Sequence, residues 1–307
     1  FIFNSVELAN PNLADMSSDF LYHLAINVPN TKDTSELQKQ FGDVRVICVG
    51  GTASRMRELA IYLGKTLNIP NSAEPVDLCK QGNRYAVFKV GPVLCASHGV
   101  GSSTFSVVLH ELLKLVKYAK CQDPIFIRIG TCGGVGVPPG TVVVTKDAYN
   151  GLLNNEHEIF ILGERVVRPA HFHKDVMLAI VACGQQSDGF DTINANTMST
   201  DCFYEGQGRI DGAVCHYNNE QKMQFLQRAH AKGIRNIEME ATMMASLTLQ
   251  AKVKAADICV TIVNRLNGDQ VCGDSEGKVP LSLEQKKNFE HRPFLIVGRY
   301  LQKLLSN

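Results

Sequence analysis

The sequence predicts an α/β protein with a substantially parallel or mixed β-sheet. Short apolar runs of strand length alternate along the chain with longer stretches whose apolar residues recur at helical spacing, which is typical of strands connected by helices. The 307 residues are 45% hydrophobic and 20% charged, a composition that fits one compact globular domain and excludes disorder. There is no internal repeat, low-complexity tract or Pro/Ser-rich linker.

The strands are expected where short apolar runs lead into glycine, proline or polar residues. They are predicted at 44–51 (VRVICVGG), on both sides of a Gly91-Pro92 turn within 85–101, at 124–136 ahead of a glycine turn, at 141–145 and at 257–266. Residues 27–40 and 272–284 lack such a pattern and are expected to be loops.

The helices are expected where apolar residues repeat every three or four positions. The clearest covers 103–121, with one apolar face that includes Phe105, Leu109 and Leu112. Others are predicted at 55–67, at 220–232 with a stop at Gly233, at 238–252, and near the C-terminus with an interruption at Pro293. Because the 238–252 segment is apolar nearly all round, we expect it to be buried.

The charges are balanced, with 31 Lys and Arg against 30 Asp and Glu, for a formal charge of +1. No block of like charge is present, so a nucleic-acid partner is not expected. No apolar stretch approaches the length of a membrane helix, so a membrane partner is not expected either. The first twenty residues are acidic rather than basic, which argues against a secretion signal, and Phe1 indicates a trimmed chain.

The ten cysteines do not form a metal or disulfide framework by their spacing. No two cysteines stand as C-x-x-C, and His171 and His173 are the only close histidine pair. Cys48 and Cys259 lie within apolar runs, where a reduced cysteine behaves as a small hydrophobic residue. We therefore expect a reducing, cytoplasmic location and no metal site.

Two glycine-containing strand ends are candidate anion sites. Residues 50–55 (GGTASR) follow the first core strand and precede a helix, where backbone N–H groups can approach an anion. The pattern is neither a Walker loop nor a dinucleotide fingerprint, so a plain strand–helix connection remains the alternative. Arg128, inside the apolar strand before Gly130, needs either an internal carboxylate or a bound phosphate, and the residue alone leaves both open.

The third candidate combines residues 203–209 (FYEGQGR) with residues 236–240 (NIEME). An aromatic ring, an amide and a guanidinium at this spacing can contact a flat heterocycle by stacking, hydrogen bonding and charge. Glu238 and Glu240 stand at the expected start of a helix, where carboxylates suit the helix dipole. They could instead bind sugar hydroxyls, and a glycosidase-like carboxylate pair is a further alternative.

Seven segments in sequence order resemble the nucleoside phosphorylase family, most closely the animal-type uridine phosphorylases. They are FGDVRVICVGGTASRM, GNRYAVFKVGPVL, HGVG, IRIGTCGGVGVPPGTVVVT, DCFYEGQGRIDGA, GIRNIEMEA and CVTIVNRLNGDQ. The resemblance extends from about Tyr22 to Gln270, and its most specific motif is FYEGQGR. It implies a three-layer single domain with a central mixed β-sheet flanked by helices over 41–307, preceded by an N-terminal arm over 1–40.

The resemblance also implies a role for individual residues. It implies a phosphate site at Gly51, Arg55, Arg84, Arg128 and Thr131; ribose contacts at His23, Thr131, Met239 and Glu240; and a uracil site at Phe203, Gln207, Arg209, Arg265, Cys132 and Gly133. The catalytic residues among them are implied to be Arg209, Gln207, Arg128 and Glu240. His23 and Arg84 are implied to reach the site of a neighbouring subunit, so a homodimer with shared sites is expected.

The implied reaction is the reversible phosphorolysis of uridine to uracil and ribose 1-phosphate, in pyrimidine salvage. Phosphate is a co-substrate, and no metal or organic cofactor is expected. A purine nucleoside phosphorylase, a hydrolytic nucleosidase and a catalytically silent nucleoside-binding paralogue are the alternatives. Two departures from the family pattern are Cys132, where Ser or Thr is usual, and Ala53, where Pro is frequent. A thiol is a poorer hydrogen-bond partner, which puts a contact at position 132 in doubt.

Overall fold

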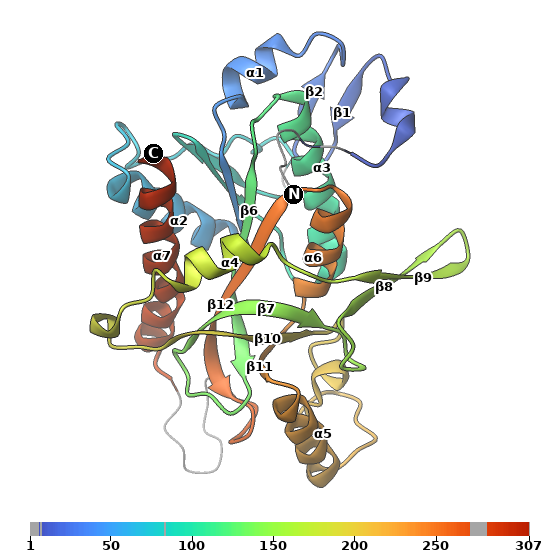
Figure 1. Cartoon of the computed structure of the whole chain (residues 1–307), viewed down its shortest axis with the longest axis vertical. Helices are drawn as coiled ribbons and strands as arrows, with labels where there is room; N and C mark the ends of the chain where they lie inside the picture. Colours follow the sequence, from blue (N-terminus) through green and yellow to red (C-terminus); the bar gives the residue numbers. More distant parts are fainter. Residues whose placement is uncertain (1–5, 7, 83, 271–280, 307) are drawn as a thin grey trace. The chain divides into compact units, whose positions relative to one another are not determined.

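The computed structural model of the chain describes residues 6, 8–82, 84–270 and 281–306. Figure 1 shows its helices and strands, coloured along the sequence. The contacts between residues group the chain into two compact units. Unit 1 comprises residues 1–129, 247–255 and 305–307, and unit 2 comprises residues 130–246 and 256–304. The predicted boundary between an arm over 1–40 and a domain over 41–307 stays a prediction. No helix in the described ranges is long and apolar enough to cross a membrane.

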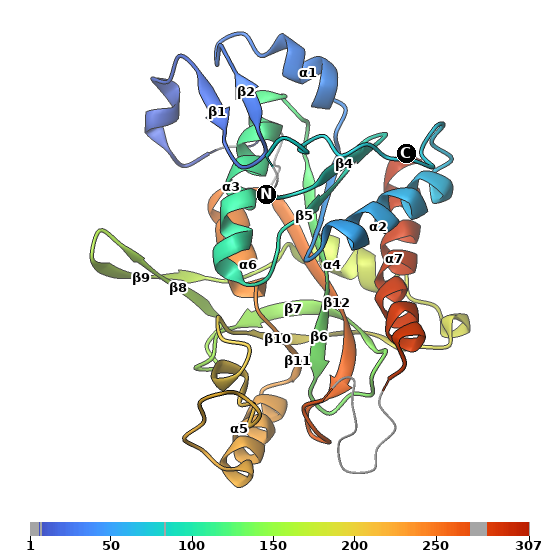
Figure 2. The ribbon, with the colours of Figure 1, turned by 180° about the vertical axis from the view of Figure 1, so that it is seen from behind.

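Unit 1 contains parallel strands and two antiparallel strand pairs together with helices, as the alternating sequence pattern predicts. Its elements are the 3-10 helix η1 (Pro11–Ala14), β1 (Asp19–Leu21), β2 (Ile26–Val28), α1 (Ser35–Phe41), β3 (Val46–Gly50), α2 (Ala53–Thr66), β4 (Val87–Val90), β5 (Val93–Ser97), α3 (Ser102–Tyr118) and the first half of β6 (Ile125–Gly134). The strand order is β6-β3-β5-β4, with β3 parallel to β5 and β6. Figure 2 shows α2 beside β4 and β5, against which it packs.

The β4–β5 hairpin turns at Gly91 and Pro92, as predicted. Gly91 has φ of +51°, a left-handed conformation that glycine adopts without strain. A Cβ at this position would also lie 2.9 Å from the Ile69 side chain. The turn thus requires glycine for both its backbone and its packing.

Unit 2 contains the remaining strands of the mixed sheet. Its elements are β7 (Val142–Tyr149), β8 (Glu156–Ile161), β9 (Glu164–Pro169), α4 (Lys174–Val181), the 3-10 helix η2 (Gln186–Asp188), β10 (Thr192–Ser199), the 3-10 helix η3 (Glu205–Gln207), α5 (Asn219–Ala231), β11 (Ile234–Glu238), the first part of α6 (Ala241–Gln250), most of β12 (Lys254–Asn264) and nearly all of α7 (Leu283–Leu305). The strand order is β11-β10-β7-β12-β6, and β11 also pairs with the carboxyl half of β6. Parallel and antiparallel pairs occur together, so the predicted mixed α/β sheet is confirmed.

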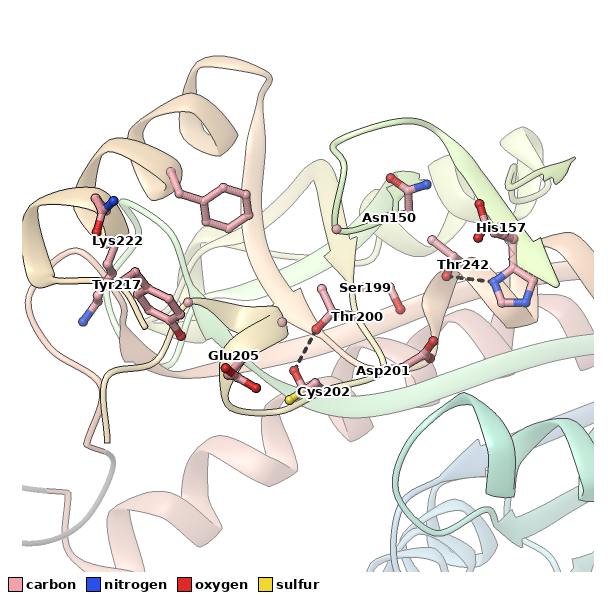
Figure 3. A pocket seen from close by; sticks show the side chains of 16 residues that line it. Asn150, His157, Ser199, Thr200, Asp201, Cys202, Glu205, Tyr217, Lys222 and Thr242 are labelled. Atoms are coloured by element: carbon pink, nitrogen blue, oxygen red, sulfur yellow. Dashed lines mark hydrogen bonds between the residues drawn. The ribbon is translucent and has the colours of Figure 1, made fainter. Parts of the chain in front are cut away.

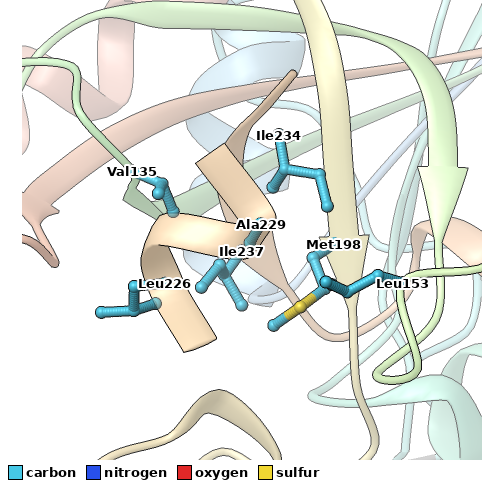
Figure 4. Packing of buried hydrophobic residues seen from close by; sticks show 7 residues of the cluster. All are labelled: Val135, Leu153, Met198, Leu226, Ala229, Ile234 and Ile237. Carbon is cyan, nitrogen blue, oxygen red and sulfur yellow. The ribbon is translucent and has the colours of Figure 1, made fainter. Parts of the chain in front are cut away.

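An apolar cluster fixes α5 against the end of this sheet (Figure 4). Its buried members are Val135, Leu153, Met198, Leu226, Ala229, Ile234 and Ile237. Leu226 and Ala229 are three residues apart and therefore share one face of α5. Burying a leucine of this kind stabilises the fold by about 1.5–3 kcal/mol. The cluster therefore holds the helix that carries Lys222 and Phe225.

Four local expectations were wrong. Residues 27–40 are not a loop, because they contain the end of β2 and most of α1. The glycines of 130–134 lie inside β6 rather than in a turn after it. Pro293 does not interrupt α7, which continues from Leu283 to Leu305. Within the predicted loop 272–284, residues 272–280 lie outside the described residues, whereas Leu283 already begins α7.

An ion pair joins α7 to the η2 turn. The Arg299 guanidinium donates two hydrogen bonds to the Asp188 carboxylate, at 2.8 and 2.6 Å. These bonds hold the pKa of Asp188 below its ordinary value of 3.8. Because the folded-state pKa lies below the unfolded one, the pair stabilises the protein above pH 3.8 and the contribution is lost as the pH falls through the folded-state pKa.

Asp188→Asn is accordingly expected to lower the free energy of unfolding by about 2 kcal/mol at neutral pH. The difference from the wild type should shrink as the pH is lowered below 3.8. Urea unfolding of both proteins from pH 7 downward measures this. A difference that stays constant over the whole range would show that the carboxylate charge plays no part.

Candidate functional site

Two glycine-containing segments of unit 1 lie side by side. Because β3 and β5 are parallel, their carboxyl ends meet at one edge of the sheet. Beyond these ends, the His98 N–H donates to the Gly50 carbonyl at 2.8 Å, and the Gly99 N–H donates to the Gly51 carbonyl at 3.1 Å. The GGTASR and HGVG motifs are therefore joined directly by backbone hydrogen bonds.

Two of the predicted arginines lie at this edge. Arg55 is in the first turn of α2, where the Thr52 side chain accepts a hydrogen bond from the Arg55 N–H at 3.3 Å and caps the helix. Arg128 is 3% exposed on β6 and pairs in register with Val49, two residues before Gly51. The N-terminus of α2 with Arg55 in its first turn, and the buried Arg128 on the neighbouring strand β6, are features suited to binding a phosphate-sized anion.

Arg84 and His23 lie in a different pocket of unit 1. Both line a cavity of 490 Å³ together with Tyr22, Tyr85 and Thr104. Neither Arg55 nor Arg128 lines it. The structure therefore brings together the two residues that the sequence resemblance assigns to a neighbouring subunit.

The His23 ring is held by a carboxylate that the sequence analysis missed. Glu111, on α3, is 9% exposed and accepts hydrogen bonds from the His23 backbone N–H at 3.0 Å and the Leu24 N–H at 2.9 Å. The same carboxylate lies 2.7 Å from His23 Nδ1. Because a carboxylate only accepts, Nδ1 carries the proton, and in the neutral ring Nε2 is left as an acceptor.

In unit 2, the strand ends of β10 and β11 bring two predicted motifs together. The strands are parallel with Ser199 opposite Glu238, and the Thr200 N–H donates to the Glu238 carbonyl at 3.1 Å. Residues 200–209 and the Met239–Glu240 pair thus begin at the same edge of the sheet. Glu240 is 4% exposed, so its carboxylate is shielded from water.

Glu238 ends β11 rather than standing within a helix that starts at residue 238. Its carboxylate accepts hydrogen bonds from the Glu240 N–H at 2.8 Å and the Ala241 N–H at 3.0 Å. These are backbone donors at the start of α6, so Glu238 caps that helix. The contacts of Glu238 therefore support its role at the start of the helix rather than a contact with a sugar.

The FYEGQGR segment places an aromatic ring, an amide and a guanidinium together. Arg209 Cζ lies 4.1 Å from the centroid of the Phe203 ring, which is 43% exposed. Gln207 and Arg209 are only 3% and 5% exposed. Arg209 Nε has no hydrogen-bond partner among the described residues, so a buried donor is left for a ligand. Burial, and then the charge of Arg265, lower the pKa of Arg209.

Arg265 lies directly behind this segment. It is completely buried and donates from Nη2 to the Gln207 carbonyl at 2.8 Å. A Cβ on Gly133 would approach the Arg265 side chain to 3.0 Å, so a glycine at this point of β6 leaves room for the arginine. Thr131 is half-buried and Cys132 is 4% exposed on the same strand.

A second cavity of 490 Å³ lies within unit 2 (Figure 3). Its lining includes Ser199, Thr200, Glu205, Tyr217, Lys222 and Thr242. The predicted base contacts Phe203, Gln207 and Arg209 do not line it, although Glu205, Gly206 and Gly208 from the same segment do. The Tyr217 hydroxyl donates to the Arg209 carbonyl. One wall of this cavity therefore supports residues 203–209, which are here called the base segment.

Three charged residues to which no sequence motif assigned a role hold the predicted ones, either directly or through one another. They are Glu111, Lys222 and Asp269. Helix periodicity gave no signal for Glu111 or Lys222, because a charged residue on a helix is normally solvated. Within the described ranges, no group of three or more His, Cys, Asp or Glu side chains could hold a metal ion.

The mixed sheet flanked by helices is that of the nucleoside phosphorylase fold. The sequence profile of the phosphorylase superfamily matches residues 45–301, and the chain belongs to this superfamily.

Several relatives carry more specific names. Uridine phosphorylase 1 of Mus musculus is 39% identical over 302 residues, which cover 98% of this chain and 93% of the mouse protein. A solved uridine phosphorylase structure from the oomycete Phytophthora capsici superposes with a TM-score of 0.91 at 37% identity and covers 99% of both chains. The Schistosoma mansoni uridine phosphorylase solved with uracil has a TM-score of 0.86 at 34% identity, over 96% of this chain and 98% of that one.

Proposed function

We propose that the chain catalyses the reversible phosphorolysis of uridine to uracil and ribose 1-phosphate. The buried Gln207–Arg209 pair carries the proposal, because an amide and a guanidinium with an unused buried donor suit the oxygens of a pyrimidine. The names of the full-length relatives point to the same substrate. A cytoplasmic role in pyrimidine salvage is proposed with it, and the many buried cysteines fit a reducing compartment.

In this reaction a phosphate oxygen forms a bond to C1′ of the ribose as the C1′–N1 bond breaks. The electron pair of the broken bond passes to the base, which later takes a proton from water. Gly51, Arg55, Arg84, Arg128 and Thr131 are proposed to bind the phosphate. Charge-assisted hydrogen bonds from the arginines would hold the nucleophile and balance the positive charge that develops on the ribose.

The remaining residues are proposed to bind the nucleoside. Glu240, with Met239, would accept hydrogen bonds from ribose hydroxyls. Phe203 would stack on the base, and Gln207 and Arg209 would donate to its oxygens as negative charge builds there. Arg265, Cys132 and Gly133 are proposed to complete the base site.

A uridine cleavage assay with and without phosphate tests the proposal. We expect equal amounts of uracil and ribose 1-phosphate, formed only when phosphate is present. A chelator should leave the rate unchanged, because no metal or organic cofactor is proposed.

Uracil released without phosphate would identify a hydrolase, and cleavage of inosine but not uridine would overturn the base assignment. If no nucleoside is cleaved, binding measured by calorimetry distinguishes a silent nucleoside-binding paralogue.

We further propose a homodimer in which His23 and Arg84 act in the partner's site. Their common pocket, which lacks Arg55 and Arg128, supports this assignment. The carboxylate of Glu111 holds the His23 ring through Nδ1, so Nε2 is the ring atom proposed to meet a ribose hydroxyl.

Mixing two impaired variants tests the shared site. Arg84→Ala and Arg209→Ala are each expected to lose most of their activity alone, but a mixed dimer would contain one intact site. Random exchange of subunits at equal amounts should restore about a quarter of the wild-type sites. Mixing Arg209→Ala with Gln207→Ala is the control, because both changes lie in the same unit and should not complement. Absence of recovery in verified mixed dimers would show that each chain uses its own Arg84.

A further inference from the structure

The base segment is held by a buried cluster of four charged residues, here called the cation cluster. It consists of Arg209, Lys222, Arg265 and Asp269, which are 5%, 5%, 0% and 8% exposed. Asp269 contacts each of the three cations. Its Oδ2 accepts from Lys222 Nζ at 2.7 Å, its Oδ1 accepts from Arg265 Nε at 2.8 Å, and its backbone carbonyl accepts from Arg209 Nη1 at 2.8 Å.

The cluster also fixes the orientation of Gln207. Besides its hydrogen bond to the Gln207 carbonyl, Arg265 directs Nη1 toward the Gln207 amide oxygen at 3.5 Å. A guanidinium has only donors, so it faces the oxygen end of the amide and leaves the NH₂ group to donate elsewhere. Asp269 holds Arg265 and thereby determines which end of the amide is available to a base.

The cluster holds three cations and one carboxylate. Lys222 and Arg265 contact the Asp269 carboxylate, whereas Arg209 contacts only the Asp269 backbone carbonyl. Burial alone would raise the pKa of Asp269, but the hydrogen bond from Lys222 and the charge of Arg265 outweigh it and keep the pKa below its ordinary value. Asp269 therefore remains ionised at neutral pH. The excess positive charge is costly in a buried place, and an anion next to Gln207 and Arg209 would offset it. A base that gains negative charge is stabilised more than a neutral one.

We propose that Lys222 and Asp269 are positioning residues for departure of the base. Through Arg265 and Arg209 they hold Gln207 in the orientation that stabilises the electron pair arriving on the base when the C1′–N1 bond breaks. The inference rests on the proposed function, because it assumes that Gln207 and Arg209 contact the base. Lys222 lies on α5 and reaches the cluster from the wall of the cavity in Figure 3.

The test compares Lys222→Met and Asp269→Asn with the wild type on uridine and on 5-fluorouridine, at saturating phosphate. Fluorine withdraws electrons, so 5-fluorouracil leaves more easily and depends less on the protein. With uridine, kcat should fall by about 10- to 100-fold while KM changes by less than about threefold. With 5-fluorouridine the loss in kcat should be several-fold smaller. Lys222→Arg, which keeps the charge, should recover most of the activity.

Asp188→Asn is the matched control, because it removes a buried, arginine-bound carboxylate from the same unit without contacting the cation cluster. It should leave kcat unchanged for both nucleosides. Equal losses on the two nucleosides, or unchanged kcat in folded Lys222→Met and Asp269→Asn, would overturn the inference. If the wild type itself fails to cleave uridine with phosphate, the proposed function fails instead, so the two failures are distinguishable.

Discussion

Replacing Arg209 with alanine is expected to lower kcat for uridine phosphorolysis by about 100- to 1,000-fold, which corresponds to about 3–4 kcal/mol in the transition state. The guanidinium is 5% exposed and stacks on Phe203, and its Nε has no partner among the described residues. A buried donor of this kind interacts weakly with a neutral base and strongly with one that is gaining negative charge. KM for uridine should therefore rise much less than kcat falls.

Steady-state kinetics with uridine, together with a single-turnover measurement of the chemical step, checks this expectation. Arg228→Ala is a suitable control, because Arg228 also lies over an aromatic ring, Phe225 at 5.9 Å, but on the exposed face of α5. The control should leave kcat unchanged. A rise in KM with unchanged kcat in Arg209→Ala would mean that Arg209 binds the ground state only, and its assignment to the leaving base would be wrong.

Arg128→Met is expected to weaken the use of phosphate by the enzyme. Arg128 is 3% exposed on β6, beside the strand end that leads into Gly51 and α2. Methionine keeps a long side chain but has no charge and no donors. We expect kcat/KM for phosphate to fall by about 100-fold, since a charge-assisted hydrogen bond in a buried place is lost.

Thermal unfolding provides a measurement that does not depend on turnover. A ligand present at about 100 times its Kd stabilises the folded state by about 2.7 kcal/mol. Phosphate should therefore raise the Tm of the wild type and have little effect on the Tm of Arg128→Met. Arg57→Met, which changes an exposed arginine of α2, should keep the response to phosphate. An equal phosphate shift in the Arg128 variant would place the phosphate elsewhere.

The strands and helices with a strong local pattern were predictable from the sequence. The apolar run at 44–51 became β3, the Gly91-Pro92 turn joins β4 and β5, and the amphipathic stretch at 103–121 became α3. The pairs β1–β2 and β8–β9 were missed because their residues are largely exposed or too few to show a period. Pro293 was misjudged because the apolar face around it, with Phe294 and Val297 buried, outweighs the loss of one backbone donor.

Among the candidate site residues too, some were predictable from a local pattern and others were not. Phe203, Gln207 and Arg209 were recognisable because they share one short motif, and Arg128 because a charge inside an apolar strand is unusual. Glu111 and Lys222 stand on helices, where charged residues are ordinary. Their roles depend on partners 88 and 47 residues away, His23 and Asp269.

The sequence by itself determined the α/β class and the core strands, and its family motifs provided the side chains that are proposed to meet a phosphate, a sugar and a base. Only the tertiary structure decided which of those side chains are buried and which residues contact them. It placed His23 with Arg84 in one pocket and made Asp269 the common partner of three cations. The physical reason is that a hydrophobic period is a local property of the chain. The burial of a charge and the choice of its partner depend on which distant segments the fold brings together.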